Sequence, residues 1–170
     1  SRRNNCRFKT MCKGNRGSPI LILDKMKTIK PSFVDLNLNA TSKKEAISLL
    51  VEHLWNEGKL SEKEYYFEAV LKREELLSTY CGYAIAIPHA ESNAVKEASF
   101  VFGRTSDMAW DEEDESVQFI ILLAIPSAED GEENKHIEMM SNVATIALEE
   151  DIREKWVNAT TIEEMINTFN

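Results

Sequence analysis

His89 has the setting in this sequence that best suits group-transfer chemistry. It follows an apolar run and Pro88, which has no backbone N–H and cannot continue a strand ladder, so the chain should turn there. The turn would place the imidazole at the carboxyl end of a buried strand, where open α/β sheets commonly bind ligands. Such an imidazole is either a nucleophile or a hydrogen-bonded structural residue, and position alone leaves both interpretations open.

A second histidine, His136, opens a predicted helix. The first turn of a helix has unpaired N–H groups and a partial positive charge, so an imidazole there tends to stay neutral and a phosphate is favoured beside it. The alternative is an exposed residue of the capping turn. The third histidine, His53, shares an earlier helix with Ala46, Leu49 and Leu50, where we expect a partly buried structural residue.

Arg73, at the end of a predicted second helix, is followed closely by Ser78 and Thr79. A guanidinium offers a planar fork for phosphate oxygens, and hydroxyl groups can add further donors. The plainer alternative is a surface arginine that pairs with a neighbouring acid such as Glu74. Taken alone, the arginine fits that alternative better.

The residues that bind metals in other proteins do not form a recognisable set here. The three cysteines (Cys6, Cys12 and Cys81) form no CxxC pair, and the spacing of the histidines matches no metal-binding pattern. The acidic run at 111–115 has the composition of a solvated loop. We therefore expect no metal and no cofactor, and a metal-dependent hydrolase using His89 is the rival hypothesis from another class.

The elements that would position these residues follow from hydrophobic periodicity. Residues 33–39 alternate apolar and polar side chains, which predicts a half-buried strand. Ser42 and Glu45 have the spacing of a capping box at the start of a first helix, and Ser61 and Glu64 repeat that spacing for a second.

The middle of the chain changes to the period of strands. Residues 83–88 predict a strand with Tyr83 and Ile85 on one face and alanines on the other. A short strand is expected at 99–104, and the nearly continuous apolar run 117–126 predicts a central strand buried on both faces.

Helical patterns return after an acidic loop, with one long helix near residues 135–148 and a last helix starting at Thr160 with Glu163. The order is one strand, two helices, three strands, and two or three helices. This order predicts an α/β domain in which two helix layers cover a mixed sheet.

Basic residues are concentrated at the start of the chain. Of the 20 basic and 29 acidic side chains, nine basic and one acidic lie in the first 30 residues, so the remaining 140 carry 11 basic and 28 acidic groups. That body should repel nucleic acid and anionic membrane surfaces. We assign 1–27 to a basic extension, expected to be flexible, and 28–170 to the domain.

Membrane and export signals are not expected. No stretch approaches the roughly 18 apolar residues that would span a bilayer, and the basic start leads into no apolar run of signal-peptide type. We therefore expect a cytoplasmic protein.

Residues 71–92 resemble the active-site region of the fructose/mannitol-type enzyme IIA family (EIIA type-2) of sugar phosphotransferase systems (PTS). The family pattern is an Arg-Glu pair, a Ser/Thr-Thr pair before a glycine turn, and an apolar strand ending in Pro-His. The matching residues here are Arg73–Glu74, Ser78–Thr79, Gly82, and Ala84 through His89. The resemblance covers roughly residues 33–169. Tyr80 and Cys81 depart from it, because small or aliphatic residues are more usual before the glycine.

The resemblance implies a fold and a set of roles. The fold would be a roughly five-stranded mixed sheet sandwiched between helices in three layers. His89 would be the phosphorylated histidine and His136 the second active-site histidine, while Arg73 and Thr79 would line the phosphate pocket. This hypothesis requires an uncharged, exposed His89 ring near Arg73 and His136.

The resemblance also implies partners. Phosphorylated HPr, a small carrier protein, would donate the phosphoryl group, and an enzyme IIB component would accept it. A membrane enzyme IIC would be an associated subunit rather than a reason for this chain to enter the membrane. The alternative is a regulatory nitrogen-type PTS protein, which uses the same histidine but binds target proteins according to its phosphorylation state; we favour transport.

Overall fold

The computed structural model describes residues 30–112, 114–127 and 133–169, with the side chains of 133–137 left outside the description. Residues 1–29, and with them the predicted extension, lie outside the described residues. The elements are η1 (Pro31–Phe33), β1 (Val34–Leu38), α3 (Lys43–Asn56), α4 (Lys63–Leu76), β2 (Tyr80–Gly82), β3 (Ile85–Ala86), β4 (His89–Ser92), β5 (Ser99–Ala109), β6 (Ser116–Pro126), α5 (Glu133–Ala147), α6 (Glu150–Asn158) and α7 (Ile162–Asn167).

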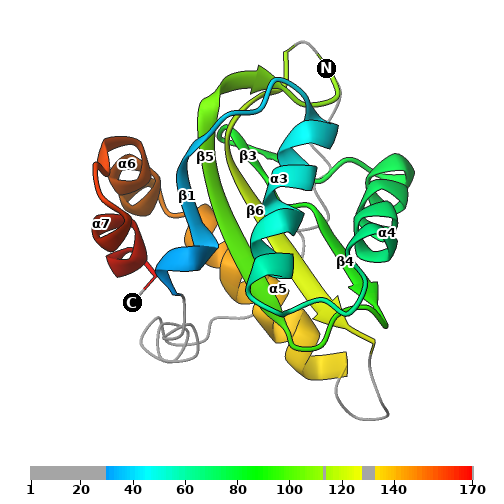
Figure 1. Ribbon diagram of the computed structural model, residues 1–170. Helices are drawn as coiled ribbons and strands as arrows, with labels where there is room; N and C mark the ends of the chain where they lie inside the picture. The colour runs from blue at the N-terminus through cyan, green and yellow to red at the C-terminus, as the bar shows by residue number, and fades with distance from the viewer. Residues whose placement is uncertain (1–29, 113, 128–132, 170) are drawn as a thin grey trace.

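The strands form one mixed sheet in the order β1-β5-β6-β3-β2, and β4 also pairs with β6 (Figure 1). β5 and β6 are antiparallel, β1 runs parallel to β5, and both β3 and β4 run parallel to β6. The predicted mixed sheet is confirmed. It has six strands, where the residue pattern predicted four and the resemblance implied about five, because β2 and β4 were not predicted as separate strands.

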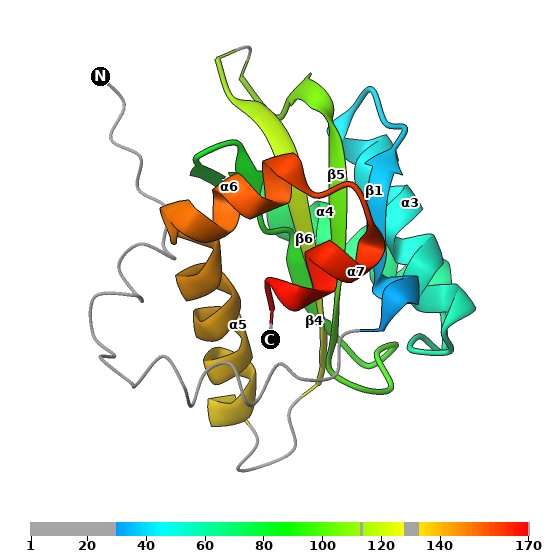
Figure 2. The same cartoon turned by 90° about the vertical axis from the view of Figure 1, so that its left-hand side faces the viewer.

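Helices cover the sheet on both faces, α3 and α4 on one and α5 to α7 on the other (Figures 1 and 2). The central strand β6 alternates between the two layers. Ile120 and Leu122 belong to the apolar cluster beneath α3 and α4, whereas Ile121 and Leu123 belong to the cluster beneath α5 to α7. The prediction that this strand is buried on both faces is therefore confirmed.

The helix starts match the sequence prediction only in part. Ser42 caps α3, where its hydroxyl accepts the Glu45 N–H at 3.2 Å. The predicted cap of the second helix is wrong: Ser61 donates its hydroxyl and its N–H to the Ala94 carbonyl, and α4 begins two residues later. The last helix is capped by Thr161 instead of Thr160.

The predicted strand 83–88 is confirmed only at Ile85–Ala86, because the chain reverses at Tyr83 and Ala84. Gly82, Tyr83 and Ala84 have φ angles of 82°, 54° and 61°, and they join β2 to β3 in an antiparallel hairpin. Left-handed conformations at both central residues match the twist of a two-residue hairpin. Tyr83 is 55% exposed instead of lying beside the buried Ile85. The turn predicted at Pro88 is wrong, since β4 continues the parallel pairing with β6 in the same register as β3.

Hydrogen bonds to the central strand hold this strained turn. The Ala84 carbonyl accepts the N–H groups of Gln118 and Phe119, at 2.9 and 3.0 Å. Each non-glycine residue in the left-handed region costs on the order of 1 kcal/mol or more, so bonds of this kind are needed to keep it there.

Among the described helices, none has the length and apolar composition needed to cross a membrane.

His53 joins α3 to the first strand. Its Nε2 lies 3.1 Å from a carboxylate oxygen of Asp35 in β1, and its Nδ1 lies 3.1 Å from the Ser32 carbonyl. Both partners accept hydrogen bonds, so the imidazolium can donate to both at once. The hydrogen bond with Asp35 raises the pKa of His53 against the opposing effect of burial, and lowers the pKa of Asp35.

The His53–Asp35 contact should make stability depend on pH. Its contribution is complete between the unfolded pKa values of 3.8 for Asp35 and 6.5 for His53, and is lost as pH rises through the raised pKa of folded His53. We expect His53→Gln to lower the free energy of unfolding by about 0.5–1 kcal/mol more at about pH 5.5 than at about pH 9, measured by urea denaturation. Asp35→Asn should remove the same pH dependence, and equal losses at the two pH values would contradict this contact.

Candidate functional site

His89 is the first residue of β4 and pairs with Leu123 of β6. Paired residues share a face of the sheet, and Leu123 belongs to the apolar cluster beneath α5 to α7. The neighbouring Ala90 belongs to the opposite cluster, as strand alternation requires. The imidazole therefore faces the α5 side of the sheet, while α4 covers the other face, where the Tyr66 hydroxyl donates to the Leu123 carbonyl at 2.8 Å.

One hydrogen bond defines the protonation of the His89 ring. Nδ1 lies 2.9 Å from the Ile87 carbonyl oxygen. A carbonyl can only accept, so Nδ1 donates its proton, and in the neutral ring the lone pair is on Nε2. The structure thus identifies Nε2 as the nitrogen that can attack an electrophile.

The surroundings of His89 keep the ring uncharged. Burial lowers its pKa to about 4; the bond to the Ile87 carbonyl opposes this effect, and the positive charge of Arg73 adds to it. The predicted neutral imidazole is consistent with this environment. The expectation of an exposed ring is wrong, because His89 is only 8% exposed. Its position beside the central strand, with helices on both faces, accounts for the burial. Any phosphoryl transfer at this ring therefore requires that Nε2 become accessible to the donor.

Arg73 lies in the last turn of α4 and is half-buried. Its Nη1 donates to the Leu77 carbonyl at 2.9 Å, which satisfies an end of its own helix. Its positive charge contributes to lowering the pKa of His89, and its predicted role in lining a phosphate pocket stays a prediction. A guanidinium in this place can stabilise negative charge that arrives at the ring.

Thr79 is 1% exposed and makes contacts that the sequence did not indicate. Its N–H lies 3.3 Å from a carboxylate oxygen of Glu74, and its hydroxyl donates to the other oxygen of the same carboxylate. That Thr79 binds phosphate stays a prediction. Glu74 is the residue that sequence reasoning missed; its only signal was membership of the Arg-Glu pair.

His136 lies in the first turn of α5, on the helix that covers the same face of the sheet as His89. Its side chain lies outside the described residues, so its proposed part in the site stays a prediction. Within the described residues, no group of three or more His, Cys, Asp or Glu side chains is arranged to hold a metal ion.

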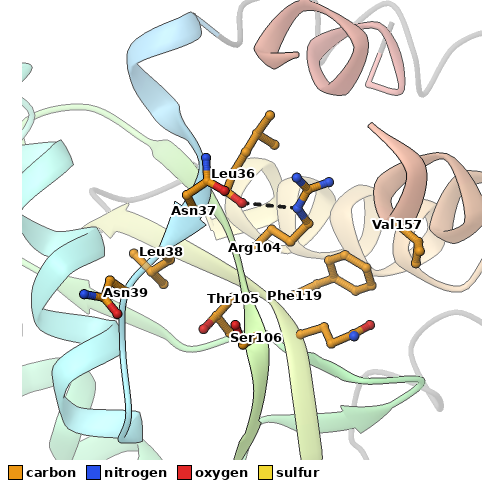
Figure 3. Close-up of a pocket in the computed structure, with 10 residues that line it drawn as sticks. Leu36, Asn37, Leu38, Asn39, Arg104, Thr105, Ser106, Phe119 and Val157 are labelled. Atoms are coloured by element: carbon orange, nitrogen blue, oxygen red, sulfur yellow. Dashed lines mark hydrogen bonds between the residues drawn. The ribbon is translucent and has the colours of Figure 1, made fainter. Parts of the chain in front are cut away.

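A separate hollow of about 520 Å³ lies at the end of β1, lined by residues that include Asn37, Asn39 and Gln118 (Figure 3). Arg104 lies in the wall of this hollow, and its Nε donates to the Leu36 carbonyl at 3.2 Å. Its Nη1 donates to two carbonyls near the end of α6, at 2.9 and 2.6 Å. Through these bonds Arg104, in β5, links β1 to the end of α6, which is a structural role. His89 is not among the residues that line this hollow, so the hollow is separate from the His89 site.

Comparison with known proteins identifies the family. Residues 27–170 match the family described as "Phosphoenolpyruvate-dependent sugar phosphotransferase system, EIIA 2". The chain belongs to this family. The resemblance seen in the sequence around His89 is therefore confirmed, and so is membership in a group of phosphotransferase relay proteins.

Curated relatives of this EIIA 2 chain include EIIABC components and separate enzyme IIA components. It is 36% identical over 138 residues to the PTS system 2-O-alpha-mannosyl-D-glycerate-specific EIIABC component of Escherichia coli, covering 79% of this chain and 21% of that protein. It is 30% identical over 151 residues to the mannitol-specific phosphotransferase enzyme IIA component of Bacillus subtilis, covering 85% of this chain and 98% of that protein. The chain thus spans about a fifth of the length of the EIIABC relatives that it matches.

Solved structures share the fold of this EIIA 2 chain. The nitrogen regulatory protein IIA-Ntr from Neisseria meningitidis is 28% identical with a TM-score of 0.75, covering 86% of this chain and 99% of that one. IIA mannitol from Escherichia coli is 27% identical with a TM-score of 0.72, and the match covers 84% of this chain and 99% of that one. The predicted mannitol-type enzyme IIA fold is confirmed.

The depressed pKa of His89 can be measured directly. We expect its ring resonances to titrate with a midpoint near a pKa of about 4, because burial disfavours the imidazolium, while an unfolded histidine takes up its proton near 6.5. The free energy of unfolding should therefore fall as pH decreases from 6.5 towards 4. Nitrogen-15 NMR of the rings reports the midpoint, His89→Asn identifies the resonance, and a midpoint near 6.5 would contradict the proposed burial effect.

Proposed function

We propose that this EIIA 2 chain is a phosphoryl carrier of a sugar phosphotransferase system, in which His89 accepts a phosphoryl group from phosphorylated HPr and passes it to an enzyme IIB component. The observation that supports this most strongly is the bond from Nδ1 to the Ile87 carbonyl, because it leaves the nucleophilic lone pair on Nε2. The relay would operate in the cytoplasm, with enzyme IIC as the membrane subunit.

The transfer exchanges one phosphorus–nitrogen bond for another. Nε2 of neutral His89 attacks the phosphorus in line, its bond to phosphorus forms, and the bond to the nitrogen of the donor histidine breaks. The attack places positive charge on the His89 ring. The Ile87 carbonyl already accepts the Nδ1 proton, so it stabilises that charge without having to reorient.

The same environment favours onward transfer. An imidazole with a pKa of about 4 is a weaker base than a free imidazole, so it leaves phosphorus more readily. Arg73 supplies a positive charge that acts on the ring. The N-terminal end of α5 would add the partial charge of unpaired N–H groups if the phosphoryl group lies beside it. His136, in that first turn, would hydrogen-bond the phosphoryl group rather than accept it. No metal is needed for this chemistry.

The second candidate is the regulatory nitrogen-type protein. Its support is the 28% identity to IIA-Ntr. The identity to IIA mannitol is nearly the same, 27%, so these identities do not separate the two functions. Both functions use the same phosphohistidine. Capture of a target protein only by the unphosphorylated chain would favour regulation, whereas transfer to an enzyme IIB would favour transport.

Phosphorylation can be tested by incubating the chain with phosphorylated HPr and measuring acid-labile phosphate. We expect His89→Ala to lose labelling completely and His136→Ala to keep some labelling while transferring more slowly, because only His89 supplies the attacking nitrogen. His53→Gln, a histidine outside the site, is the control and should label normally. Full labelling of His89→Ala would defeat the assignment, and complete loss in His136→Ala would reverse the two roles.

Docking of the donor can be separated from the chemistry. Leu76 and Leu77, just after Arg73, are 83% and 48% exposed, as suits residues that a protein partner covers. We expect Leu76→Asp to raise the KM for phosphorylated HPr by about three- to tenfold with little change in kcat. Val157→Asp, at another exposed apolar residue (56% exposed) beside the Figure 3 hollow, should leave KM unchanged. Equal effects of the two changes would argue against docking at Leu76.

A further inference from the structure

Glu74 carries a carboxylate whose side chain is only 1% exposed, in the last turn of α4. A buried charge is costly unless other groups pair with it and donate hydrogen bonds. Three groups do so here: the Thr79 N–H, the Thr79 hydroxyl, and the Lys43 ammonium at 3.2 Å. The carboxylate therefore holds Thr79 through two hydrogen bonds, one from its backbone N–H and one from its side-chain hydroxyl.

Two further hydrogen bonds lead from Thr79 to the phosphorylation site. The Thr79 carbonyl accepts the Ile87 N–H at 3.2 Å, and the Ile87 carbonyl accepts Nδ1–H of His89 at 2.9 Å. Only two residues thus separate the carboxylate of Glu74 from the imidazole. A shift of Thr79 would move Ile87, and with it the carbonyl that sets the ring's tautomer.

Lys43 is placed for this contact and not for its own helix. It is the first residue of α3, where the helix dipole disfavours a positive charge. Its ammonium also pairs with Asp111 and lies 5.4 Å from the centre of the Trp110 ring. Burial lowers the pKa of Lys43, but the bonds and charges of Asp111 and Glu74 outweigh burial and raise it overall, so the counter-ion stays charged.

We propose that Glu74, with Lys43 as its counter-ion, is a positioning residue for His89: by holding Thr79 it aims the Ile87 carbonyl at Nδ1 and keeps the lone pair on Nε2. This inference rests on the proposed function. It also gives Thr79 a role in the frame of the site. A hydroxyl has one proton, and because that proton is donated to Glu74, the oxygen would offer phosphate only lone pairs.

The first test replaces Glu74 by glutamine, which keeps the shape but loses the charge and brings an N–H₂ group against Lys43 or the Thr79 N–H. We expect kcat for transfer from phosphorylated HPr to fall by about ten- to a hundredfold while KM stays within about twofold, because positioning is lost and docking is kept. Nitrogen-15 NMR should show the His89 ring changing from the Nδ1–H tautomer to a mixture. Glu75→Gln, at the exposed neighbouring residue, is the matched control and should change neither quantity.

The second test is a double-mutant cycle with Thr79→Val. If Glu74 acts through Thr79, each single change shifts the tautomer, and the double variant is about as slow as the slower single variant, since both remove the same contact. Thr79→Ser keeps the hydroxyl and should restore activity. Losses that multiply, with an unchanged tautomer in Thr79→Val, would instead make Thr79 an independent phosphate ligand and overturn the proposal.

The outcomes separate this inference from the proposed function. A wild-type chain that takes no phosphate from phosphorylated HPr would defeat the proposed function, yet the tautomer of His89 in each variant would still test the role of Glu74. A folded Glu74→Gln chain with the wild-type tautomer and rate would defeat the positioning role alone. If thermal melting shows that Glu74→Gln does not fold, Thr79→Val gives the same NMR test, and an unchanged tautomer there overturns the proposal.

Discussion

The bond between Nδ1 of His89 and the Ile87 carbonyl is the interaction on which the site depends. It joins residues on either side of Pro88, so the ring reaches back across the proline to the preceding carbonyl. In the proposed transfer this bond would select the nitrogen that attacks, and the carbonyl would then stabilise the charge that the attack creates. Burial complements it by lowering the pKa of the ring to about 4, so the nucleophile is neutral over the physiological range.

The strained hairpin makes this arrangement possible. Thr79 can accept the Ile87 N–H only because the chain reverses between β2 and β3, at Tyr83 and Ala84. Both residues adopt left-handed conformations that glycine would adopt at less cost. The stabilisation comes from the Ala84 carbonyl, which accepts two N–H groups of β6 and anchors the turn to the most buried strand of the sheet.

Local pattern predicted the parts of this molecule that local interactions determine. The apolar run of β6 and the cap at Ser42 were recognisable because each depends on a few neighbouring residues. The turn expected at Pro88 is wrong, since β3 and β4 pair with β6 in one continuous parallel register on either side of it. The hairpin was missed, since alternation of large and small residues carries no information about the sign of φ at Tyr83. The role of Glu74 was equally hidden, because its counter-ion Lys43 lies 31 positions earlier and only the packing of α3 against α4 joins them.

Adjacent residues at the end of α4 carry opposite charges because they face different surroundings. Successive residues on a helix point about 100° apart, so Arg73 can be half-exposed while Glu74 is buried. In the proposed relay a phosphoryl group would bring negative charge to His89, and a carboxylate beside it would repel that charge. Glu74 instead contacts Thr79 and is paired with Lys43. Under the proposal it would give the site the rigidity of a buried anion, while Arg73 supplies the charge that acts on the ring.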